Sequence, residues 1–588
     1  INGLDGPYTQ ILIDSRPIFS ALSGVYGLEQ IPANMIERVE VMRGGGSALF
    51  GSSAIAGTIN IITKEPLRNS GQLAHTITSI GGSSSFDNNT SLNASLVTDD
   101  HRAGLYVFGQ NRHRDAYDHD GDGYSEMPKL KNQTVGFRSF LKTSTYSKLT
   151  FEYHHLQEFR RGGNMLNRPP HEADIAEQIQ HSINGGGLKF DYFAPNEKHR
   201  LTLYTSAQHT DRDSYYGSKK DLNAYGKTTD LTFIGGSQYV YSFDKCLFMP
   251  ADLTAGLEYN RDNLKDDMWG YNRYTRQTVN IGSAFFQNEW KNEKWSILLG
   301  GRLDKHNLIN HVIFSPRANL RFNPTQDVNL RLSYSSGFRA PQAFDEDLHI
   351  ENVGGTVSMI ERAKNLKEEK SQSFSASADM YHRFGAFQVN FLVEGFYTKL
   401  SDVFVLENIG VRDGILIKER RNGSGAKVLG LSMEGKMAYL SLFQLQAGVT
   451  LQQSRYDEPE KWSETAPAQK KIFRTPNTYG YFTATYTPVK PLSVSLSGTY
   501  TGSMLVQHMA GYIKNDIAVN TRDFFDMGVK LAYDFKLYKT IDLQLSAGVQ
   551  NVFNAYQNDF DQGVERDSGY IYGPAAPRSY FAGVKISY

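Results

Sequence analysis

The sequence alternates apolar and polar side chains with a period of two, and this pattern limits the possible folds more than any other feature. Segments 148–154, 328–334 and 493–500 each place aliphatic or aromatic residues on one face and polar or charged residues on the other. Side chains two positions apart share one face of a β-strand, so each segment predicts a strand with lipid on one side and water or protein on the other. No apolar run reaches the roughly 18 residues of a spanning helix.

The connections between these segments are of two lengths. Short polar turns, such as residues 98–101 and 292–294, interleave with long segments at about 113–131, 158–180, 210–227, 261–278, 338–370, 401–426, 454–475, 503–521 and 554–577. Short turns on one rim and long loops on the other are typical of barrels in the bacterial outer membrane. Residues 67–588 allow about 24 residues for each of about 22 strands with its connection, enough for a crossing of about 9–11 residues. We therefore predict an all-β membrane protein, a 22-stranded antiparallel transmembrane β-barrel over 67–588.

Residues 1–66 lack the long alternating segments of the rest of the chain. Short apolar runs are broken by Gly44–Gly46, Gly51 and Gly57, which predicts a small domain of short strands and tight turns. The glycine run lacks the Gly-Lys-Ser/Thr ending of a phosphate-binding loop, so we reject that alternative. Ile1 begins in the middle of a pattern, and we expect an upstream part, including any export signal, to be absent from this sequence.

Composition excludes several classes of function. Lys+Arg and Asp+Glu both number 62, which gives no reason to expect a nucleic-acid partner. The single cysteine, Cys246, excludes a disulfide framework. We find no nucleophile–base constellation, since even His154 and His155 are neighbours on opposite strand faces, so we do not expect an enzyme. A large soluble β-protein such as a propeller would show a repeated blade motif, and none is present.

Several motifs resemble those of TonB-dependent transporters. Glu37–Gly44, Ala48–Gly51 and Ala56–Ile62 are similar in order and spacing to the family's plug domain. The resemblance extends to Tyr334–Pro341, Asn551–Asn554 and a last strand that ends on an aromatic residue. It implies that residues 1–66 are the C-terminal part of a plug inside the barrel. It also implies that TonB, acting on a segment before Ile1, drives import of a scarce, bulky small-molecule ligand. A passive porin is the alternative from another class.

One acidic segment, residues 115–126, predicts a cation site. Carboxylates at nearly alternate positions with glycines between them can surround a hard cation with oxygen, which is calcium chemistry. Lys129 stands where the bidentate glutamate of an EF-hand loop would be, and a solvated acidic turn is the alternative. The predicted structural calcium ligands are Asp115, Asp118, Asp120, Asp122 and Glu126.

Three further groups are candidate ligand-binding residues. Aromatic side chains among polar ones could hold a planar ligand or form an interfacial girdle; they are Tyr215, Tyr216, Trp269, Tyr271 and Tyr274. Arg160 and Arg161 could meet an anionic chelate or the phosphates of lipopolysaccharide. His349, between an Arg-Ala-Pro box and Asn365-Leu366, resembles the axial ligand of haem transporters, although a surface histidine is the alternative.

The loop pattern resembles that of transporters from Bacteroides-like bacteria, in which a surface lipoprotein often caps the barrel. By this analogy we predict cobalamin (vitamin B12) as cargo, because such transporters order their loops with calcium. Haem is the second candidate and a ferric siderophore the third.

Overall fold

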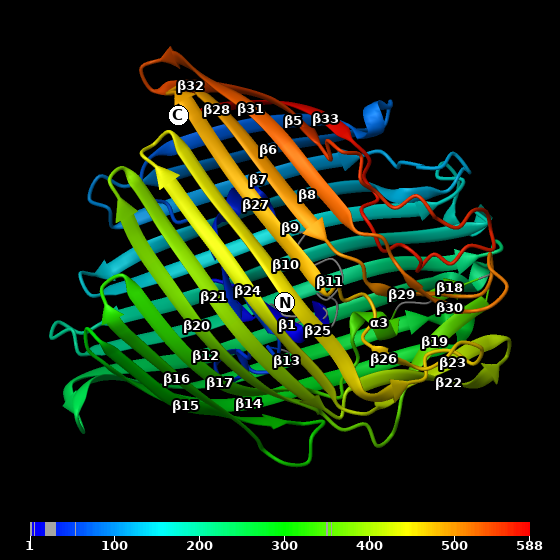
Figure 1. Ribbon diagram of the computed structural model, residues 1–588, viewed down its shortest axis with the longest axis horizontal. Helices are drawn as coiled ribbons and strands as arrows, with labels where there is room; N and C mark the ends of the chain where they lie inside the picture. The colour runs from blue at the N-terminus through cyan, green and yellow to red at the C-terminus, as the bar shows by residue number, and fades with distance from the viewer. Residues whose placement is uncertain (1–2, 5, 18–30, 53, 349–350, 354–355) are drawn as a thin grey trace.

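The main element of the structure is a closed antiparallel barrel (Figure 1). The computed structural model describes residues 3–4, 6–17, 31–52, 54–348, 351–353 and 356–588. The ring closes where β33 (Ser579–Ser587) pairs with β5 (Ser70–Ser79), from Tyr580 opposite Ser79 to Ser587 opposite Gln72. Of the 23 strands in the ring order, β26 (Gln469–Lys471) is a short insert, since its neighbours β25 and β27 also pair directly. The described residues therefore form the predicted barrel of 22 strands (23 − 1).

The first half of the ring consists of β6 (Phe86–Val97), β7 (Ala103–Arg114), β8 (Ser125–Ser144), β9 (Ser147–Gly163), β10 (Ile175–Phe193), β11 (His199–Ser218), β12 (Tyr225–Cys246), β13 (Met249–Met268), β14 (Arg273–Lys291) and β15 (Trp295–His306). The second half consists of β16 (Ile313–Thr325), β17 (Val328–Arg339), β20 (Glu369–Phe384), β21 (Phe387–Ser401), β24 (Ala426–Tyr439), β25 (Phe443–Glu460), β27 (Thr478–Val489), β28 (Leu492–Thr501), β31 (Phe524–Tyr538) and β32 (Ile541–Gln550).

Many strands are longer than the sequence predicted. β12 has 22 residues, and the segments 158–180, 210–227 and 261–278, predicted as loops, are in large part strand. A membrane crossing needs only about 9–11 residues. Cross-strand hydrogen bonds satisfy the backbone equally well outside the lipid, so membrane thickness does not limit the ladder. The prediction of loops in these three segments was wrong, because the strands continue beyond the lipid into the surrounding water.

The two faces of the strands follow the predicted parity. Leu330, Leu332, Val584 and Ile586 are between 38 and 56% exposed on the outer surface. Ser333 and Ser335, on the opposite face of β17, line a small cavity together with Met42–Gly45 of the N-terminal domain. Arg331 shares the parity of these serines and therefore lies on the lumen side, as predicted.

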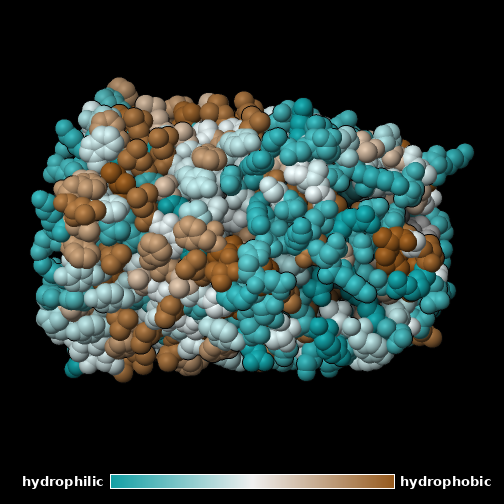
Figure 2. Space-filling model, turned by 90° about the horizontal axis from the view of Figure 1, so that it is seen from below, coloured by the Kyte–Doolittle hydropathy of each residue, from teal (hydrophilic) through white to brown (hydrophobic). Residues whose placement is uncertain are grey.

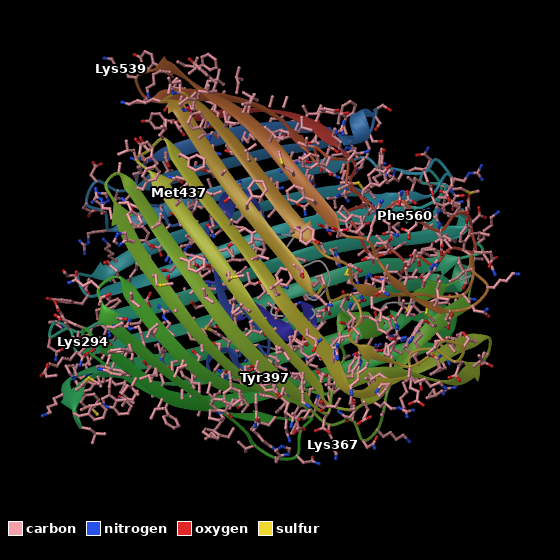
Figure 3. All side chains as sticks on the ribbon, viewed as in Figure 1. Lys294, Lys367, Tyr397, Met437, Lys539 and Phe560 are labelled. Atoms are coloured by element: carbon pink, nitrogen blue, oxygen red, sulfur yellow. The ribbon has the colours of Figure 1, made fainter. Side chains whose placement is uncertain are left out.

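Most of the hydrophobic surface lies on one part of the barrel. Figure 2 shows apolar side chains concentrated toward one end and hydrophilic side chains over the other. Figure 3 places Lys294 and Lys539 at the end that carries the short turns and Phe560 at the opposite end, among the long loops. No helix within the described part of the chain is long and apolar enough to cross a membrane.

The N-terminal residues form a small sheet inside the barrel (Figure 1). Its order is β2 (Arg16–Pro17), β1 (Thr9–Ile13), β4 (Gly57–Thr63) and β3 (Ile36–Arg43), with β1 and β4 parallel. The described part of the plug also contains the short helices η1 (Gly6–Tyr8), η2 (Ala33–Met35) and α2 (Ser47–Phe50). The predicted boundary at residue 66 falls between β4 and the first barrel strand, β5.

Short elements fold over the long-loop end. A four-stranded sheet has the order β18 (Glu351–Val353), β19 (Thr356–Arg362), β23 (Ile415–Asn422) and β22 (Phe404–Arg412). A two-stranded sheet joins β29 (Leu505–His508) to β30 (Ile517–Asn520). The other helices among the described residues are η3 (Ile80–Gly82), η4 (Pro170–Glu172), η5 (Leu222–Ala224), η6 (Trp269–Tyr271) and α3 (Asp345–Leu348).

The parity of β17 gives a direct test of membrane orientation. Leu332→Arg should lower the free energy of unfolding in lipid vesicles by about 2–4 kcal/mol, because it places a charge in the hydrocarbon. Ser497→Arg is the matched control, since Ser497 lies on the polar face of β28. Denaturant titration of both variants makes the comparison. Equal costs at the two positions would contradict the assignment of faces.

Candidate ligand-binding site

A cavity of about 590 Å³ lies between the plug and the elements at the long-loop end. The plug contributes Gly3, Leu4, Pro7 and Tyr8 to its lining. Its volume falls within the range of about 300–1,000 Å³ that is usual for ligand pockets. Aromatic side chains from six positions line it, namely Tyr8, Tyr216, Phe404, Tyr456, Trp462 and Phe473. Charged side chains of both signs share the lining: Arg339, Lys418, Arg420, Lys461, Arg474, Glu177, Glu346, Glu460 and Asp567.

The floor of the cavity joins the plug to the barrel. The Tyr8 hydroxyl donates a 2.9 Å hydrogen bond to Glu369 Oε1, and the Phe404 amide donates to the same oxygen at 2.5 Å. Arg339 Nη1 lies 3.5 Å from Glu369 Oε2, and both side chains are at most 4% exposed. Tyr8 also packs against the hydrophobic cluster that contains Leu4 and Leu400. The plug and two barrel strands, β17 and β20, therefore meet at one buried ion pair.

Helix α3 is held beside the cavity by arginines. Arg420 donates to Glu346 at 3.0 Å and to Asp347 Oδ1 at 2.6 Å, and Arg212 donates to Asp345 at 2.7 Å. Asp345 and Asp347 are buried, so each needs its cationic partner. These pairs fix α3 against the barrel wall and the loop sheet.

Two long loops meet above the cavity. His508 Nε2 lies 2.9 Å from Asp561, and its ring stacks on Tyr570 with centroids 3.7 Å apart. Asp567 accepts hydrogen bonds from the Met509 and Gly569 amides, and burial raises the pKa of its carboxyl group. Residues 503–521 and 554–577 thus form one packed unit.

Only some of the five predicted calcium ligands in the acidic segment, residues 115–126, lie close together. Carboxylate oxygens of Asp118, Asp120 and Glu126 lie within 4.8 Å of one another. Asp122 instead pairs with Arg566 and accepts from the Gly563 amide at 2.9 Å. Asp115 accepts from the Phe86 amide at 3.0 Å and stands outside this group. The structure thus groups three of the five predicted ligands, while a backbone amide and a guanidinium bind Asp115 and Asp122. The same guanidinium, that of Arg566, also donates to Glu126 Oε1 at 3.1 Å.

Neighbouring groups hold this segment in place. The His119 ring lies between Tyr556 and Phe560, with centroids at 3.8 and 5.8 Å, at the long-loop end that Phe560 marks in Figure 3. Glycines at 121 and 123 adopt φ of 78° and 89°, which L side chains rarely adopt. Partial burial, and then the Asp122 carboxylate, raise the pKa of Asp120.

The predicted aromatic group does not form one site. Tyr216 alone of the five lines the cavity. The hydroxyls of Tyr215 and Tyr271 donate to Asp221, at 2.9 Å to its carbonyl and 2.5 Å to its carboxylate, and brace the rim. Trp269 and Tyr274 are 54 and 53% exposed and are absent from the cavity lining. Aromatic residues in long loops have several structural uses, and the sequence could not distinguish them.

The two arginines of the predicted basic cluster do not line the cavity. Arg160 is 9% exposed and donates to Glu158 at 2.7 Å. Arg161 is 1% exposed, and its guanidinium donates to the Gly162 and Asn164 carbonyls. Successive residues of a strand point to opposite faces, so the two arginines do not act together. The remaining candidate, His349, lies outside the described residues.

Below the cavity the plug is tied to the wall by ion pairs. Arg138 of β8 donates to Asp14 at 2.5 Å and to Glu65 at 3.2 Å, and Arg16 pairs with Glu152 of β9. On the other side, Arg43 pairs with Glu434 of β24. No motif revealed these partners, because each pair joins residues far apart in the sequence.

A barrel of this size with a plug inside it defines the class of gated outer-membrane barrels, and comparison with known families agrees. Residues 60–552 match the family model described as TonB dependent receptor-like, beta-barrel, and residues 1–58 match the TonB-dependent Receptor Plug Domain. The chain therefore belongs to the TonB-dependent receptors, an outer-membrane family of receptors and transporters rather than enzymes.

Individual relatives are distant. The Vitamin B12 transporter BtuB of Vibrio vulnificus is 24% identical over 356 residues, covering 59% of this chain and 54% of the relative. The Iron-regulated outer membrane virulence protein of Vibrio cholerae is 26% identical over 362 residues, covering 58% of this chain and 51% of the relative. The chain thus spans about half the length of the curated relatives it matches.

Solved structures agree with the fold. The siderophore receptor PirA from Acinetobacter baumannii covers all of this chain with 92% of its own, at a TM-score of 0.80 and 17% identity. A ferric enterobactin receptor (PfeA) mutant from Pseudomonas aeruginosa, solved with enterobactin, gives a TM-score of 0.79 at 18% identity, covering 100% of this chain and 93% of its own. At such identity these structures share the architecture alone.

Proposed function

We propose that this protein imports a bulky small molecule across the outer membrane in a TonB-dependent manner. The observation that carries the proposal is the cavity whose floor is the plug itself, at Tyr8, and whose walls are the loop elements. A ligand held there contacts both the gate and the barrel. TonB would then displace the plug, and the ligand would pass. A plug held to the barrel wall by buried ion pairs such as Arg138–Asp14 would block the open channel that a passive porin needs.

Cobalamin is the cargo we propose. The support is the similarity to proteins named as vitamin B12 transporters, together with the amphipathic lining of the cavity. Haem and a ferric siderophore are the alternatives, since other relatives and structural neighbours are iron-regulated or siderophore receptors. A capping surface lipoprotein stays a prediction from the loop pattern.

Binding measurements on the purified protein test the cargo. Cyanocobalamin should bind far more tightly than haem, and His349→Ala should leave cobalamin binding nearly intact. Intrinsic fluorescence quenching and the haem Soret band provide the two readouts. Tight haem binding that is lost in His349→Ala would favour haem over cobalamin.

We also propose calcium as a structural ion of the acidic loop, bound by Asp118, Asp120 and Glu126. Three carboxylates whose oxygens lie within 4.8 Å of one another favour a cation, and backbone carbonyls or water would complete the oxygen shell. By ordering this loop, calcium would raise ligand affinity through a shift toward the binding-competent state.

Calorimetric titration with calcium tests this assignment. Asp120→Asn should weaken calcium binding roughly tenfold or more, because it removes one charged oxygen ligand. Asp115→Asn is the matched control and should bind calcium as the wild type does, since Asp115 caps the Phe86 amide. If neither calcium nor chelator changes the heat signal or ligand affinity, the segment is a solvated acidic turn.

A further inference from the structure

Arg339 occupies an unusual environment at the floor of the cavity. It is the last residue of β17, it is 3% exposed, and it lines the cavity. Its guanidinium carbon lies 3.8 Å from the centroid of the Phe344 ring and 5.4 Å from those of Tyr8 and Phe404. The three rings exclude water and limit the directions in which the guanidinium can donate hydrogen bonds.

The hydrogen bonds of this guanidinium are incompletely satisfied. Nη1 lies 3.5 Å from Glu369 Oε2, whereas Nε and Nη2 have no hydrogen-bond partner among the described residues. A buried donor without a partner costs about 1–3 kcal/mol, and more when it is charged. Nε and Nη2 form one edge of the planar group, and that edge matches the two oxygens of a carboxylate or phosphate.

The guanidinium groups of the other arginines that line the cavity have partners within the protein. Arg420 pairs with Glu346 and Asp347. Arg474 donates to the Ile571 carbonyl at 2.9 Å and also to the Gly569 carbonyl. Arg339 is therefore the arginine lining the described cavity that keeps a complete two-donor edge for a ligand.

We propose that the Nε–Nη2 edge of Arg339 binds a carboxylate or phosphate group of the cargo. This inference rests on the proposed function and narrows it: the cargo carries an oxyanion, and that oxyanion sits at the junction of plug and barrel. Glu369 is a positioning residue, because it holds Nη1 while accepting from Tyr8 and Phe404. Phe344 and Phe404 would flank the bound group and keep it dry, which strengthens a charge-assisted hydrogen bond.

The test compares Arg339→Lys with wild type in detergent, using cyanocobalamin, haem, ferric citrate and ferric enterobactin as probes. Lysine keeps the charge but removes the two-donor edge, so affinity for the probe that binds should fall roughly tenfold or more. Arg112→Lys is the matched control, because its guanidinium pairs with Asp87 at 2.6 Å and does not line the cavity, and it should bind like wild type. Heat-modified mobility of each variant establishes that the barrel is folded.

A second measurement needs no variant. Wild-type protein should bind haem at least about tenfold more tightly than its dimethyl ester, in which both carboxylates are blocked, or cyanocobalamin more tightly than dicyanocobinamide, which lacks the phosphate together with its nucleotide. If a probe binds wild type and both comparisons show equal affinities, Arg339 is no oxyanion site although the transport proposal stands. If the wild-type protein binds none of the four probes, the result contradicts the proposed function, and with it the inference about Arg339.

Discussion

Uptake is expected to stop when a disulfide joins Gly45→Cys of the plug to Ser335→Cys of β17. A Cβ added at Gly45 would lie 3.3 Å from Ser335 Cβ, close to the spacing of about 3.5–4.5 Å that a disulfide requires. In a Cys246→Ser background the oxidised protein should bind labelled cyanocobalamin normally but import none of it. A covalent link keeps the plug against the barrel, whereas transport requires the plug to move. Reduction with dithiothreitol should restore import.

The matched control is a disulfide that leaves the plug free. Ser432→Cys with Thr450→Cys would join register partners on β24 and β25, whose hydroxyl oxygens are 2.9 Å apart. Its oxidation should leave uptake unchanged, which excludes an effect of the oxidant itself. Normal import by the oxidised Gly45–Ser335 pair would show that the plug remains against β17 throughout transport.

The second large effect is expected at a buried arginine of the barrel wall. Arg302 is 1% exposed and donates to Glu258 at 2.7 Å, to Asp304 at 2.8 Å and to Ser283 at 2.7 Å. Arg302→Met would leave two carboxylates buried without their cation. Removing one partner of such a pair costs about 3–5 kcal/mol, so the denaturant midpoint should fall sharply.

Two further variants separate charge loss from loss of packing. Arg331→Met is the matched control on an exposed lumen-side position and should change stability by at most about 0.5 kcal/mol. Combining Arg302→Met with Glu258→Gln and Asp304→Asn should recover part of the loss, because no uncompensated charge remains. A triple variant as unstable as Arg302→Met would assign the cost to packing instead.

The barrel, its strand number and the faces that meet lipid could be predicted from the sequence alone. Period-two alternation is a local property, and Leu332 and Ser333 lie on the sides that their parity predicts. The plug motifs and the glycine positions could also be recognised from short stretches of neighbouring residues. The ends of the strands could not be predicted in this way, because the alternation of apolar and polar side chains continues in the part of the barrel outside the lipid. β12, for example, has 22 residues.

The candidate site could not be predicted from the sequence, because it depends on contacts between distant segments. Tyr8 and Glu369 are 361 positions apart, and their hydrogen bond exists because the plug sits inside the closed ring. Arg161 and Asp115 looked available in the sequence, yet backbone partners hold both of them. Arg339 stood within a motif that indicated the fold, and its buried, unpartnered donor edge follows from three rings and a carboxylate that four different segments bring together. Periodicity is encoded in neighbouring residues, whereas a binding site depends on distant residues that closure of the barrel brings into contact.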